Sequence, residues 1–347
     1  GSSRPDARHS LAARATFSSP AMWSRRLGSG LCGRGALAKG LLPRWIHAHA
    51  TPDKRRAALK QLLERGELVR AIECHSGLSG ILVERARGAG GERFNATWSS
   101  SLTSSTIKGK PDIETVNTTD RLAIVHDVLE VTSLPMIYDA DTGGVPEIFH
   151  FTVRSLERLG VSACVIEDKT GLKQNSLYGT DRKQQLEDIE SFCAKIAAGK
   201  KAQVSDDFMI FARMESLIAG WGQEEALRRS RAALDAGADG IMIHSKEKQP
   251  DQILEFLAEY QKWRGEYPGR GYIVAVPTTY NCITEAELKK AGADVVIHAN
   301  QLLRAAFPAM QKAAESILTH GRSQEVDAEL LSVKEILGLI DDNTGHK

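Results

Sequence analysis

The chain has 347 residues, of which 42% are hydrophobic and 26% charged, and its formal net charge is +1. This composition is typical of a globular protein, and no apolar run approaches the roughly 20 residues of a membrane-spanning helix. Eight of the 45 basic residues lie in residues 1–50 beside one acid, Asp6, so the remainder holds 37 basic and 43 acidic residues. A mildly acidic body lacks the basic face that nucleic acid requires. We therefore expect neither a membrane nor a nucleic-acid partner.

The first fifty residues are rich in Arg, Ser, Ala and Gly and nearly free of acids, which is typical of an organellar transit peptide. The alternative is a disordered leader. We expect this segment to lie outside the fold, and a mitochondrial matrix location if it directs import or a cytoplasmic one otherwise. The five cysteines show no C-x-x-C spacing, which predicts reduced thiols, and the apolar run around Cys164 predicts a core residue.

Eight β-rich runs alternate with helical patterns from about residue 52 onward. The runs cover residues 69–75, 93–99, 134–141, 162–169, 208–216, 238–245, 272–279 and 293–300. Amphipathic helical patterns between them cover residues 147–160, 183–199, 224–237, 250–263 and 283–292. Several of these end in Gly (Gly160, Gly237, Gly292), a common helix stop.

Near-continuous apolar strands separated by helices predict a parallel sheet covered on both faces, and eight such units predict closure. We therefore predict an α/β fold, a (β/α)8 TIM-type barrel over residues 51–320, and a C-terminal helical extension over residues 321–347 with a helix near 332–340. A doubly wound open sheet is the alternative, but no G-x-G-x-x-G follows the first run.

Polar residues stand at nearly every predicted strand end, where the active site of a β/α barrel forms. They are Trp98 and Ser100, Asp139 and Asp141, Glu167 and Asp168, Arg213 and Glu215, His244 and Ser245, Thr278, and Asn300. Loops begin with polar residues in any fold, so one such position carries no information. Seven strand ends with this pattern of charges predict a site.

Three acidic residues among them predict a metal site. Asp139 and Asp141 are two residues apart on a predicted strand and so should face the same way, and Glu167 arrives from the next strand. Converging carboxylates without His or Cys at ligand spacing favour Mg2+ over Zn2+. The alternative role, capping the following helix, fits Asp141 taken alone.

Arg213, His244 and Lys173 form a cationic complement to these acids, which predicts an anion pocket. Taken singly, Arg213 could pair structurally with Glu215, and a lone histidine is more often a satisfied core residue. Residues 167–179 follow a strand directly and hold two lysines, an Asn, a Ser and two glycines. This composition suggests a mobile lid that brings polar groups to the site, and the alternative is an ordinary solvated loop.

The motifs DADTG, EDKTGLKQNS, ARMES, AGWG, HS and VPT together make the chain similar to a known family. It resembles the phosphoenolpyruvate mutase branch of the isocitrate lyase superfamily over roughly residues 52–340. The resemblance implies a β/α barrel, usually tetrameric with a helix exchanged between subunits, so we expect a homo-oligomer, a dimer or a tetramer. The family often has Gly at the position of Ser101 and Pro at that of Leu172.

The resemblance also implies roles for individual residues. Asp139 would contact Mg2+ directly, with Asp112, Asp141 and Glu167 held through water. The pyruvyl end of the substrate would lie against Trp98, Ser100, Ser101 and Leu102. The lid would supply Lys173, Asn175 and Ser176, and Arg213 and His244 would bind the phosphoryl group. These positions are read from the matching motifs of the chain.

The implied reaction is the Mg2+-dependent interconversion of phosphoenolpyruvate and phosphonopyruvate, an isomerisation that forms the carbon–phosphorus bond at the start of phosphonate biosynthesis. One alternative is a phosphonopyruvate hydrolase, and another is a Mg2+-dependent C–C bond lyase of the superfamily. The lyase branch carries a KKCGH motif where this chain has the Lys173 region, and no cysteine stands there. A non-catalytic sensor of small acids is the alternative from another class.

Overall fold

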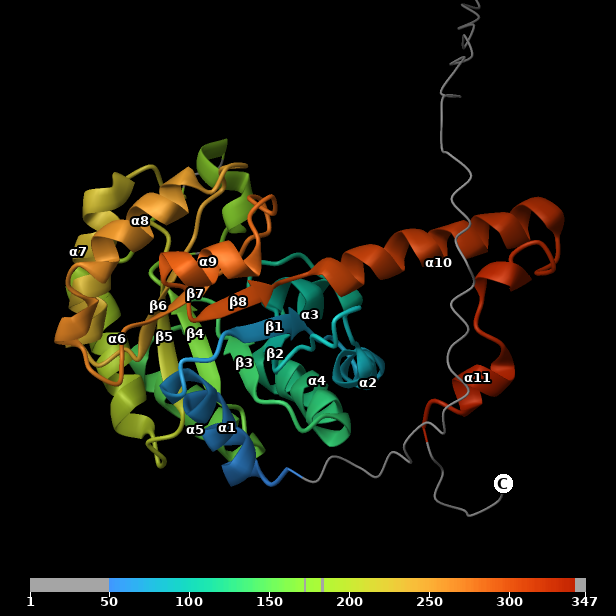
Figure 1. Cartoon of the computed structure of the whole chain (residues 1–347), viewed down its shortest axis with the longest axis horizontal. Helices are drawn as coiled ribbons and strands as arrows, with labels where there is room; N and C mark the ends of the chain where they lie inside the picture. The colour runs from blue at the N-terminus through green and yellow to red at the C-terminus, as the bar shows by residue number, and fades with distance from the viewer. Residues whose placement is uncertain (1–49, 172, 182–183, 341–347) are drawn as a thin grey trace, which may run out of the picture. The chain divides into compact units, whose positions relative to one another are not determined.

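The computed structural model describes residues 50–171, 173–181 and 184–340, and its centre is a closed barrel of eight parallel strands in chain order (Figure 1). The strands are β1 (Val69–Glu73), β2 (Ala96–Ser99), β3 (Met136–Asp139), β4 (Ala163–Glu167), β5 (Met209–Met214), β6 (Gly240–Ile243), β7 (Tyr272–Ala275) and β8 (Val295–His298). Pairing of β1 with β8, with Val69 opposite Val295, closes the ring. Each strand lies within one of the eight predicted runs, so the predicted fold class is confirmed.

The barrel separates two apolar clusters, one inside the ring and one between the ring and its helices. Successive side chains of a strand point to opposite faces. Ile137 and Val165 accordingly belong to the inner cluster, whereas their neighbours Tyr138 and Cys164 pack against helices in the outer one. Cys164 is buried, as predicted. The same alternation, continued past the apolar residues, brings the polar strand ends to the inner face.

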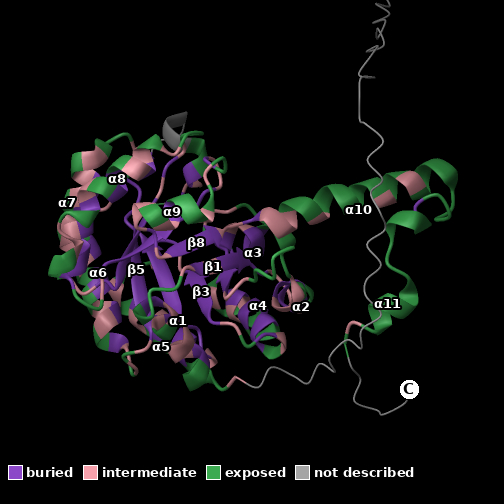
Figure 2. Ribbon diagram, viewed as in Figure 1, coloured by how far each residue is buried: buried purple, intermediate pink, exposed green. Residues whose placement is uncertain are grey.

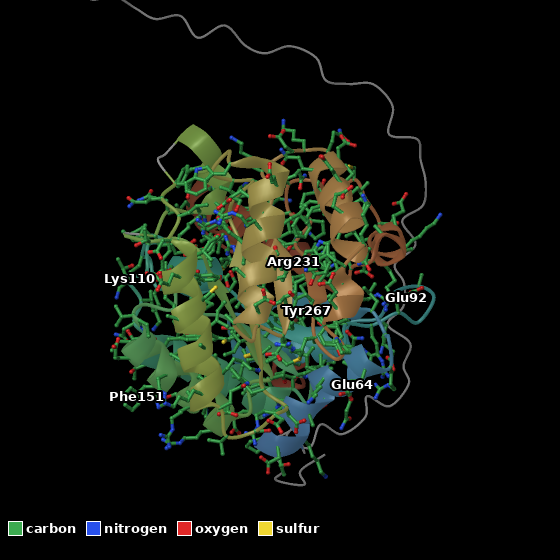
Figure 3. All side chains as sticks on the ribbon, turned by 90° about the vertical axis from the view of Figure 1, so that its left-hand side faces the viewer. Glu64, Glu92, Lys110, Phe151, Arg231 and Tyr267 are labelled. Carbon is green, nitrogen blue, oxygen red and sulfur yellow. The ribbon has the colours of Figure 1, made fainter. Side chains whose placement is uncertain are left out.

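Helices surround the barrel, and their outer surfaces carry charged side chains such as Arg231 (Figure 3). Those of the barrel are α1 (Pro52–Glu64), α2 (Gly77–Arg85), α3 (Ser101–Ile107), α4 (Thr118–Val131), α5 (Pro146–Leu159), α6 (Ile189–Ala202), α7 (Gly222–Asp235), α8 (Asp251–Gln261) and α9 (Glu285–Ala291), with 3-10 turns η1 (Ser176–Asp181) and η2 (Arg264–Glu266). The predicted glycine stop of α5 is confirmed: Gly160 has φ 85°, and a Cβ there would lie 2.6 Å from the Pro52 Cα.

One predicted helix begins later than its pattern suggests. The expected helix over 183–199 is α6, which starts at Ile189, and Lys183 lies outside the described residues. The Asp188 side chain caps the helix by accepting a hydrogen bond from the Ser191 amide at 2.9 Å. Just before it, the Glu187 amide donates to the Asp168 carbonyl. A tertiary contact with the segment after β4 therefore replaces the first turn.

Helix α1 covers the N-terminal end of the barrel. Its Leu59 and Leu63 are buried and belong to the inner cluster. Arg55 on the same helix donates to the Leu129 and Thr132 carbonyls at 3.0 and 3.1 Å. This end is therefore filled by apolar packing, which leaves the C-terminal end of the strands as the open one.

The last strand is followed by a helical segment of another character. Helix α10 (Gln301–His320) has no buried residue, and α11 (Val333–Leu337) follows after the 3-10 turn η3 (Asp327–Glu329). Figure 2 shows this C-terminal arm, residues 301–340, as largely exposed. Its exposed large apolar side chains are Phe307, Met310, Ile317, Leu318, Leu330, Leu331, Val333, Ile336, Leu337 and Ile340. The predicted helix near 332–340 is present.

The predicted leader and domain limits stay predictions. Residues 1–49 and 341–347 lie outside the described residues. Among the residues that are described, no helix has the length and apolarity to cross a membrane.

Candidate active site

A small cavity of about 60 Å3 lies at the C-terminal ends of the strands. Its walls are Trp98, Ser100, Ser101, Leu102, Asp112, Asp139, Lys173, Asn175, Ser176, Leu177, Arg213, Met242, His244, Val276, Thr278, Ala299 and Asn300. The residues with a predicted individual role are all among these except two, Asp141 and Glu167. Of the other polar strand-end residues, Thr278 and Asn300 line the cavity, whereas Asp168, Glu215 and Ser245 do not. The sequence therefore predicted most of one cavity from residues spread over more than 140 positions.

The acidic wall of the cavity is formed by Asp139 and Asp112. Asp139 ends β3, and its carboxylate accepts from the Ser101 and Asp141 amides at 3.3 and 3.2 Å. Burial disfavours its charge, but Lys173, Arg213 and Arg121 outweigh burial and lower the pKa of Asp139 to about 2. Asp139 is therefore an ionised carboxylate that faces the cavity.

Asp141 differs from the prediction that it shares a strand face with Asp139. Strand β3 ends at Asp139, and Asp141 lies in the following turn with a positive φ of 54°. Its Oδ2 accepts from Arg121 Nη1 at 2.9 Å, and its Oδ1 pairs with Lys173. The two-residue alternation fails because the backbone leaves the extended conformation. Asp141 lies behind the cavity wall, where it fixes two cations.

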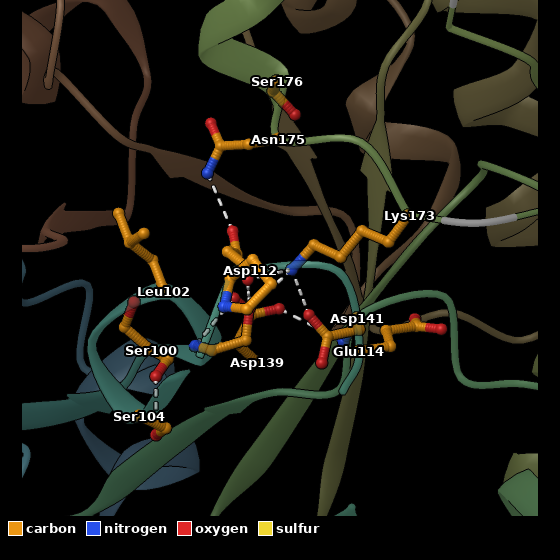
Figure 4. A network of polar contacts seen from close by, with 12 residues as sticks. Ser100, Leu102, Ser104, Asp112, Glu114, Asp139, Asp141, Lys173, Asn175 and Ser176 are labelled. Carbon is orange, nitrogen blue, oxygen red and sulfur yellow. Dashed lines mark hydrogen bonds and ion pairs between the residues drawn. The ribbon is translucent and has the colours of Figure 1, made fainter. Parts of the chain in front are cut away.

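The segment after β4 reaches across the cavity to this acidic wall (Figure 4). Lys173 Nζ contacts Asp112 Oδ1 at 3.1 Å as well as Asp141 and the Ser101 hydroxyl. The Asn175 amide nitrogen donates to Asp112 Oδ2 at 2.7 Å, and its oxygen accepts from the Leu177 amide at 3.0 Å. Lys173 and Ser176 are buried, so residues 173–176 cover the site. That the segment opens, as a lid would, stays a prediction.

The cationic wall lies on the neighbouring strands. Arg213 is on β5 and His244 directly follows β6, and both contact Glu215 Oε1, at 2.5 Å from Arg213 Nε and 2.9 Å from His244 Nδ1. Burial and the charge of Arg213 lower the pKa of His244. Arg213 Nη2 also donates to the Ser176 hydroxyl at 2.6 Å. This wall places a guanidinium fork and an imidazole opposite the ionised Asp139.

Glu167, the remaining predicted metal residue, ends β4 beneath the cavity and is buried. Neither of its carboxylate oxygens has a hydrogen-bond partner among the described residues, although Arg213 Nη2 lies 3.2 Å from Oε2. Burial is the main cause that raises the pKa of Glu167 to about 7. Orphaned, buried carboxylate oxygens are the kind of group that a cation or its water ligands would satisfy.

The donor set fits Mg2+ in one binding mode. Within the described part of the chain, no three acidic, His or Cys side chains lie close enough to hold an ion directly. Direct coordination by Asp139, Asp141 and Glu167 together therefore does not fit this arrangement. Contact through Asp139 alone, with Glu167 and Asp112 reached through water, does fit, because Mg2+ usually keeps several water ligands.

The remaining wall is mostly apolar. Trp98, Leu102 and Met242 line it together with Val276 and Ala299. The Trp98 indole nitrogen is buried without a hydrogen-bond partner in the described structure, so a ligand oxygen could accept from it. Ser100 caps helix α3, with its hydroxyl 3.4 Å from the Thr103 amide. Thr278 and Asn300 add polar atoms at the ends of the last two strands.

Three residues of this network have no individual role predicted from the sequence. Glu215 is predicted only as one of the polar strand-end residues and a possible structural partner of Arg213, and Lys169 only as part of the lid. Arg121 shares a helix face with the buried Ile124 and Val128. A charged residue at such a core-facing position is a signal that the sequence does carry. The contacts of Glu215 and Lys169 depend on how the segment after β4 folds back, which no spacing reveals.

Comparisons with known proteins agree with this geometry. The family model described as phosphoenolpyruvate phosphomutase matches residues 59–318. The chain belongs to the phosphoenolpyruvate phosphomutase family. A phosphonopyruvate hydrolase of Variovorax sp. is 41% identical over 286 residues, 81% of this chain and 93% of that one. A phosphoenolpyruvate phosphomutase of Tetrahymena pyriformis is 34% identical over 300 residues, 86% of this chain and 95% of that one.

Solved structures of the phosphoenolpyruvate phosphomutase family have the same architecture. The phosphoenolpyruvate phosphomutase of Streptomyces platensis subsp. rosaceus superposes with a TM-score of 0.75 at 38% identity, covering 82% of this chain and 94% of that one. A phosphonopyruvate hydrolase solved with oxalate and Mg2+ gives a TM-score of 0.72 with the same identity and coverage. The chain is thus an enzyme of the phosphoenolpyruvate mutase and isocitrate lyase superfamily, and relatives with two different activities resemble it to a similar degree.

Proposed function

We propose that the chain interconverts phosphoenolpyruvate and phosphonopyruvate. The observation that carries the proposal is the position of Asn175, which lines the cavity beside Asp112 and has both ends of its side-chain amide hydrogen-bonded. A phosphoryl group that leaves an enol oxygen and is recaptured by the C3 carbon needs donors that stabilise its oxygens without attacking it. Asn175 is such a donor, because a side-chain amide is a much weaker nucleophile than a water molecule or a hydroxyl group.

Arg213 and His244 would bind the phosphoryl oxygens. The guanidinium is fixed by Glu215 and Ser176, and the imidazole ring by Glu215, so both are oriented before the substrate arrives. In a loose transition state the negative charge spreads over the phosphoryl oxygens, and a preorganised guanidinium with a neighbouring imidazole stabilises that charge without rearranging. The proposed reaction takes place within one substrate molecule: one P–O bond breaks, one P–C bond forms, and no proton or water is consumed.

The pyruvyl end would lie toward Trp98, Ser100 and Leu102. Asp139 would hold Mg2+ directly, with Asp112 and Glu167 through water, and Asp141 would keep Lys173 and Arg121 in place. When bound, the ion would polarise the enolate oxygen and carboxylate of the substrate as a Lewis acid. Support comes from the orphaned oxygens of Glu167 and from the related hydrolase whose structure contains Mg2+ and oxalate.

The choice between isomerisation and hydrolysis depends on water. Met242, Val276 and Leu177 give the cavity an apolar lining that would limit the access of water to the phosphoryl position. This apolar lining favours the mutase over the hydrolase.

Phosphonopyruvate hydrolysis is the second candidate, favoured by the 41% identity to the Variovorax enzyme. The purified chain with Mg2+ and phosphonopyruvate would be assayed in parallel for phosphoenolpyruvate, through pyruvate kinase, and for pyruvate directly, through lactate dehydrogenase. The mutase produces phosphoenolpyruvate first. Pyruvate and phosphate formed at equal rates, without phosphoenolpyruvate, would establish the hydrolase.

A homo-oligomer built through the C-terminal arm, residues 301–340, is part of the proposal. The arm exposes many large apolar side chains, and helix α5 exposes Ile148 and Phe151. Figure 3 shows Phe151 on the outside of the barrel. Contiguous exposed apolar surface is typical of an interface. Sedimentation velocity of the whole chain and of Phe307→Asp should show a dimer or tetramer in the first case and a smaller species in the second.

Mitochondrial import through residues 1–50 is likewise proposed from their composition alone. A chain that starts at Thr51 should keep full activity while losing import into isolated mitochondria. Equal import of both chains, or failure of the shortened one to fold, would contradict this role.

A further inference from the structure

Glu215 lies directly after β5 and is completely buried, yet it does not line the cavity. Its two oxygens serve different parts of the site. Oε1 binds Arg213 and His244, the pair proposed to hold the phosphoryl group. Oε2 binds Ser176 at 2.6 Å and Lys169 at 2.9 Å, both from the segment after β4. One carboxylate thus joins the cationic wall to the covering segment, residues 168–171 and 173–181.

Ser176 is the member of the covering segment that completes this network. Its hydroxyl donates to Glu215 Oε2 and accepts from Arg213 Nη2 at 2.6 Å and from Lys169 Nζ at 2.7 Å. A hydroxyl has one donor and two acceptor sites, so these three contacts use all of them. Lys169 Nζ also donates to the Gln174 carbonyl at 3.0 Å, which ties the backbone of the segment to the same group.

The charges make this arrangement sensitive to the position of the segment. Although burial alone raises the pKa of Glu215, Arg213 and Lys169 hold it well below its usual range, so the carboxylate is ionised. A buried charge that loses one partner is left poorly compensated. Displacing Ser176 would deprive both Glu215 and Arg213 of a hydrogen bond, and their geometry would have to change.

We propose that Glu215 is a positioning residue that places Arg213 and His244 for phosphoryl binding only when Ser176 is seated on it. This inference rests on the proposed function for its effect on turnover, but the coupling itself does not depend on the substrate. A simpler role for Glu215 would be to neutralise Arg213 and Lys169. That role predicts no connection between the hydroxyl of Ser176 and the behaviour of the cationic wall.

The first variant is Ser176→Ala, which removes the hydroxyl and leaves every charged group in place. The matched control is Gln185→Ala, at an exposed position on the strand-like stretch that pairs with the base of the covering segment. Amide hydrogen exchange at Leu177 and Tyr178, whose amides bond to Asn175, reports on seating without substrate. Exchange should become about 10- to 100-fold faster in Ser176→Ala, as expected for loss of a hydrogen bond to a charged group, and should not change in the control.

The second variant, Glu215→Gln, keeps the shape of the side chain and removes its charge. Glu215→Asp keeps the charge on a shorter side chain and tests whether a displaced carboxylate restores activity. With phosphonopyruvate, both Ser176→Ala and Glu215→Gln should lower kcat about 10- to 100-fold and raise the ratio of phosphate to phosphoenolpyruvate. The double variant should be no worse than the worse single one, because both break the same contact. Should Glu215→Gln fail to fold, Ser176→Ala still tests the coupling through amide hydrogen exchange and through the ratio of phosphate to phosphoenolpyruvate.

Unchanged exchange at Leu177 and Tyr178 in Ser176→Ala, or strictly additive effects in the double variant, would overturn the coupling. If exchange responds while the wild-type chain forms only phosphate and pyruvate, the proposed mutase activity is wrong and the coupling stands. If the wild-type chain forms phosphoenolpyruvate but amide exchange does not change in Ser176→Ala, the mutase activity stands and the coupling is wrong.

Discussion

The strand ends of the barrel and the covering segment build the same cavity by different means. Asp139, Glu167 and Arg213 belong to paired strands, so the barrel fixes their positions. Lys173, Asn175 and Ser176 are placed by contacts of their side chains with those strand ends and with Asp112. The barrel alone therefore supplies a charged site, and the segment supplies the enclosure and the neutral donor that phosphoryl transfer requires.

The two ends of the barrel also differ in the side chains that fill them. At the N-terminal end α1 fills the ring with Leu59 and Leu63, and at the C-terminal end the inner face carries ionisable groups. Apolar packing stabilises the fold, whereas buried charges are weak evidence for stability. Substitutions at one end should change stability, and those at the other should change chemistry.

The largest effect is expected at the strand end of β3. Asp139→Ala removes the ionised carboxylate proposed to bind Mg2+, so turnover should fall below about one thousandth of the wild-type rate. The far-ultraviolet circular dichroism should be unchanged because Asp139 ends a strand outside the apolar core. Asp206→Ala, at an exposed position before β5 near the opposite end, is the matched control and should keep full activity. Turnover of wild-type protein that survives excess chelator would contradict the metal's role.

A smaller effect is expected in the covering segment. Asn175→Ala should lower isomerisation by about two to three orders of magnitude, the usual loss when one preorganised donor is removed. The strand-end charges remain, so binding of oxalate with Mg2+, followed by calorimetry, should weaken far less than kcat falls. A loss of oxalate affinity as large as the loss in kcat would show that Asn175 acts in ground-state binding instead.

The metal site should respond to pH through Glu167. Its pKa is raised to about 7, so the carboxyl is protonated below that pH and must lose its proton to assist the ion. The affinity for Mg2+ should therefore fall as the pH is lowered from 8 to 6, approaching tenfold per unit below 7. Titration calorimetry measures this affinity without turnover. Glu167→Gln should flatten the dependence, and an equally steep dependence in that variant would exclude Glu167 as its source.

At the closed end of the barrel the expected effect on chemistry is the smallest. Leu59→Ala leaves a cavity beneath the strands and should lower the free energy of unfolding by about 2–5 kcal/mol. The kcat should stay within twofold of wild type where the protein is folded. Lys54→Ala, at an exposed position on the same helix, should change the unfolding free energy by less than about 0.5 kcal/mol in urea titrations. A large loss of kcat in folded Leu59→Ala would mean that the two ends are coupled.

The sequence predicted those features of the fold that depend on the periodic spacing of apolar residues. Apolar runs at regular intervals predicted all eight strands, and the alternation of side chains predicted that Asp139, Arg213 and His244 meet at one end. It misplaced Asp141, because a positive φ at that residue breaks the alternation. It also extended α6 forward by five or more residues, because residues 184–188 favour helix locally while Glu187 pairs with Asp168.

Contacts between the covering segment and the strands could not be predicted in this way. The role of Glu215 depends on Ser176 and Lys169 folding back onto it, and their spacing from Glu215 along the chain implies no contact. The roles predicted for Lys173 and Asn175 came from the resemblance to a family, because residue type alone does not distinguish a site residue from an ordinary loop residue. Tertiary contacts decided which carboxylate each would meet.

The most direct test of the proposed mutase activity is a phosphorus NMR time course of the purified chain with phosphonopyruvate and Mg2+. The phosphonate resonance should decay while the resonance of phosphoenolpyruvate, a phosphate ester, grows as the first new signal, and the total of the two should stay constant. Asn175→Ala in the same experiment should slow this exchange. Inorganic phosphate as the first new signal in the wild-type sample, with pyruvate in equal amount, would contradict the mutase and identify a hydrolase.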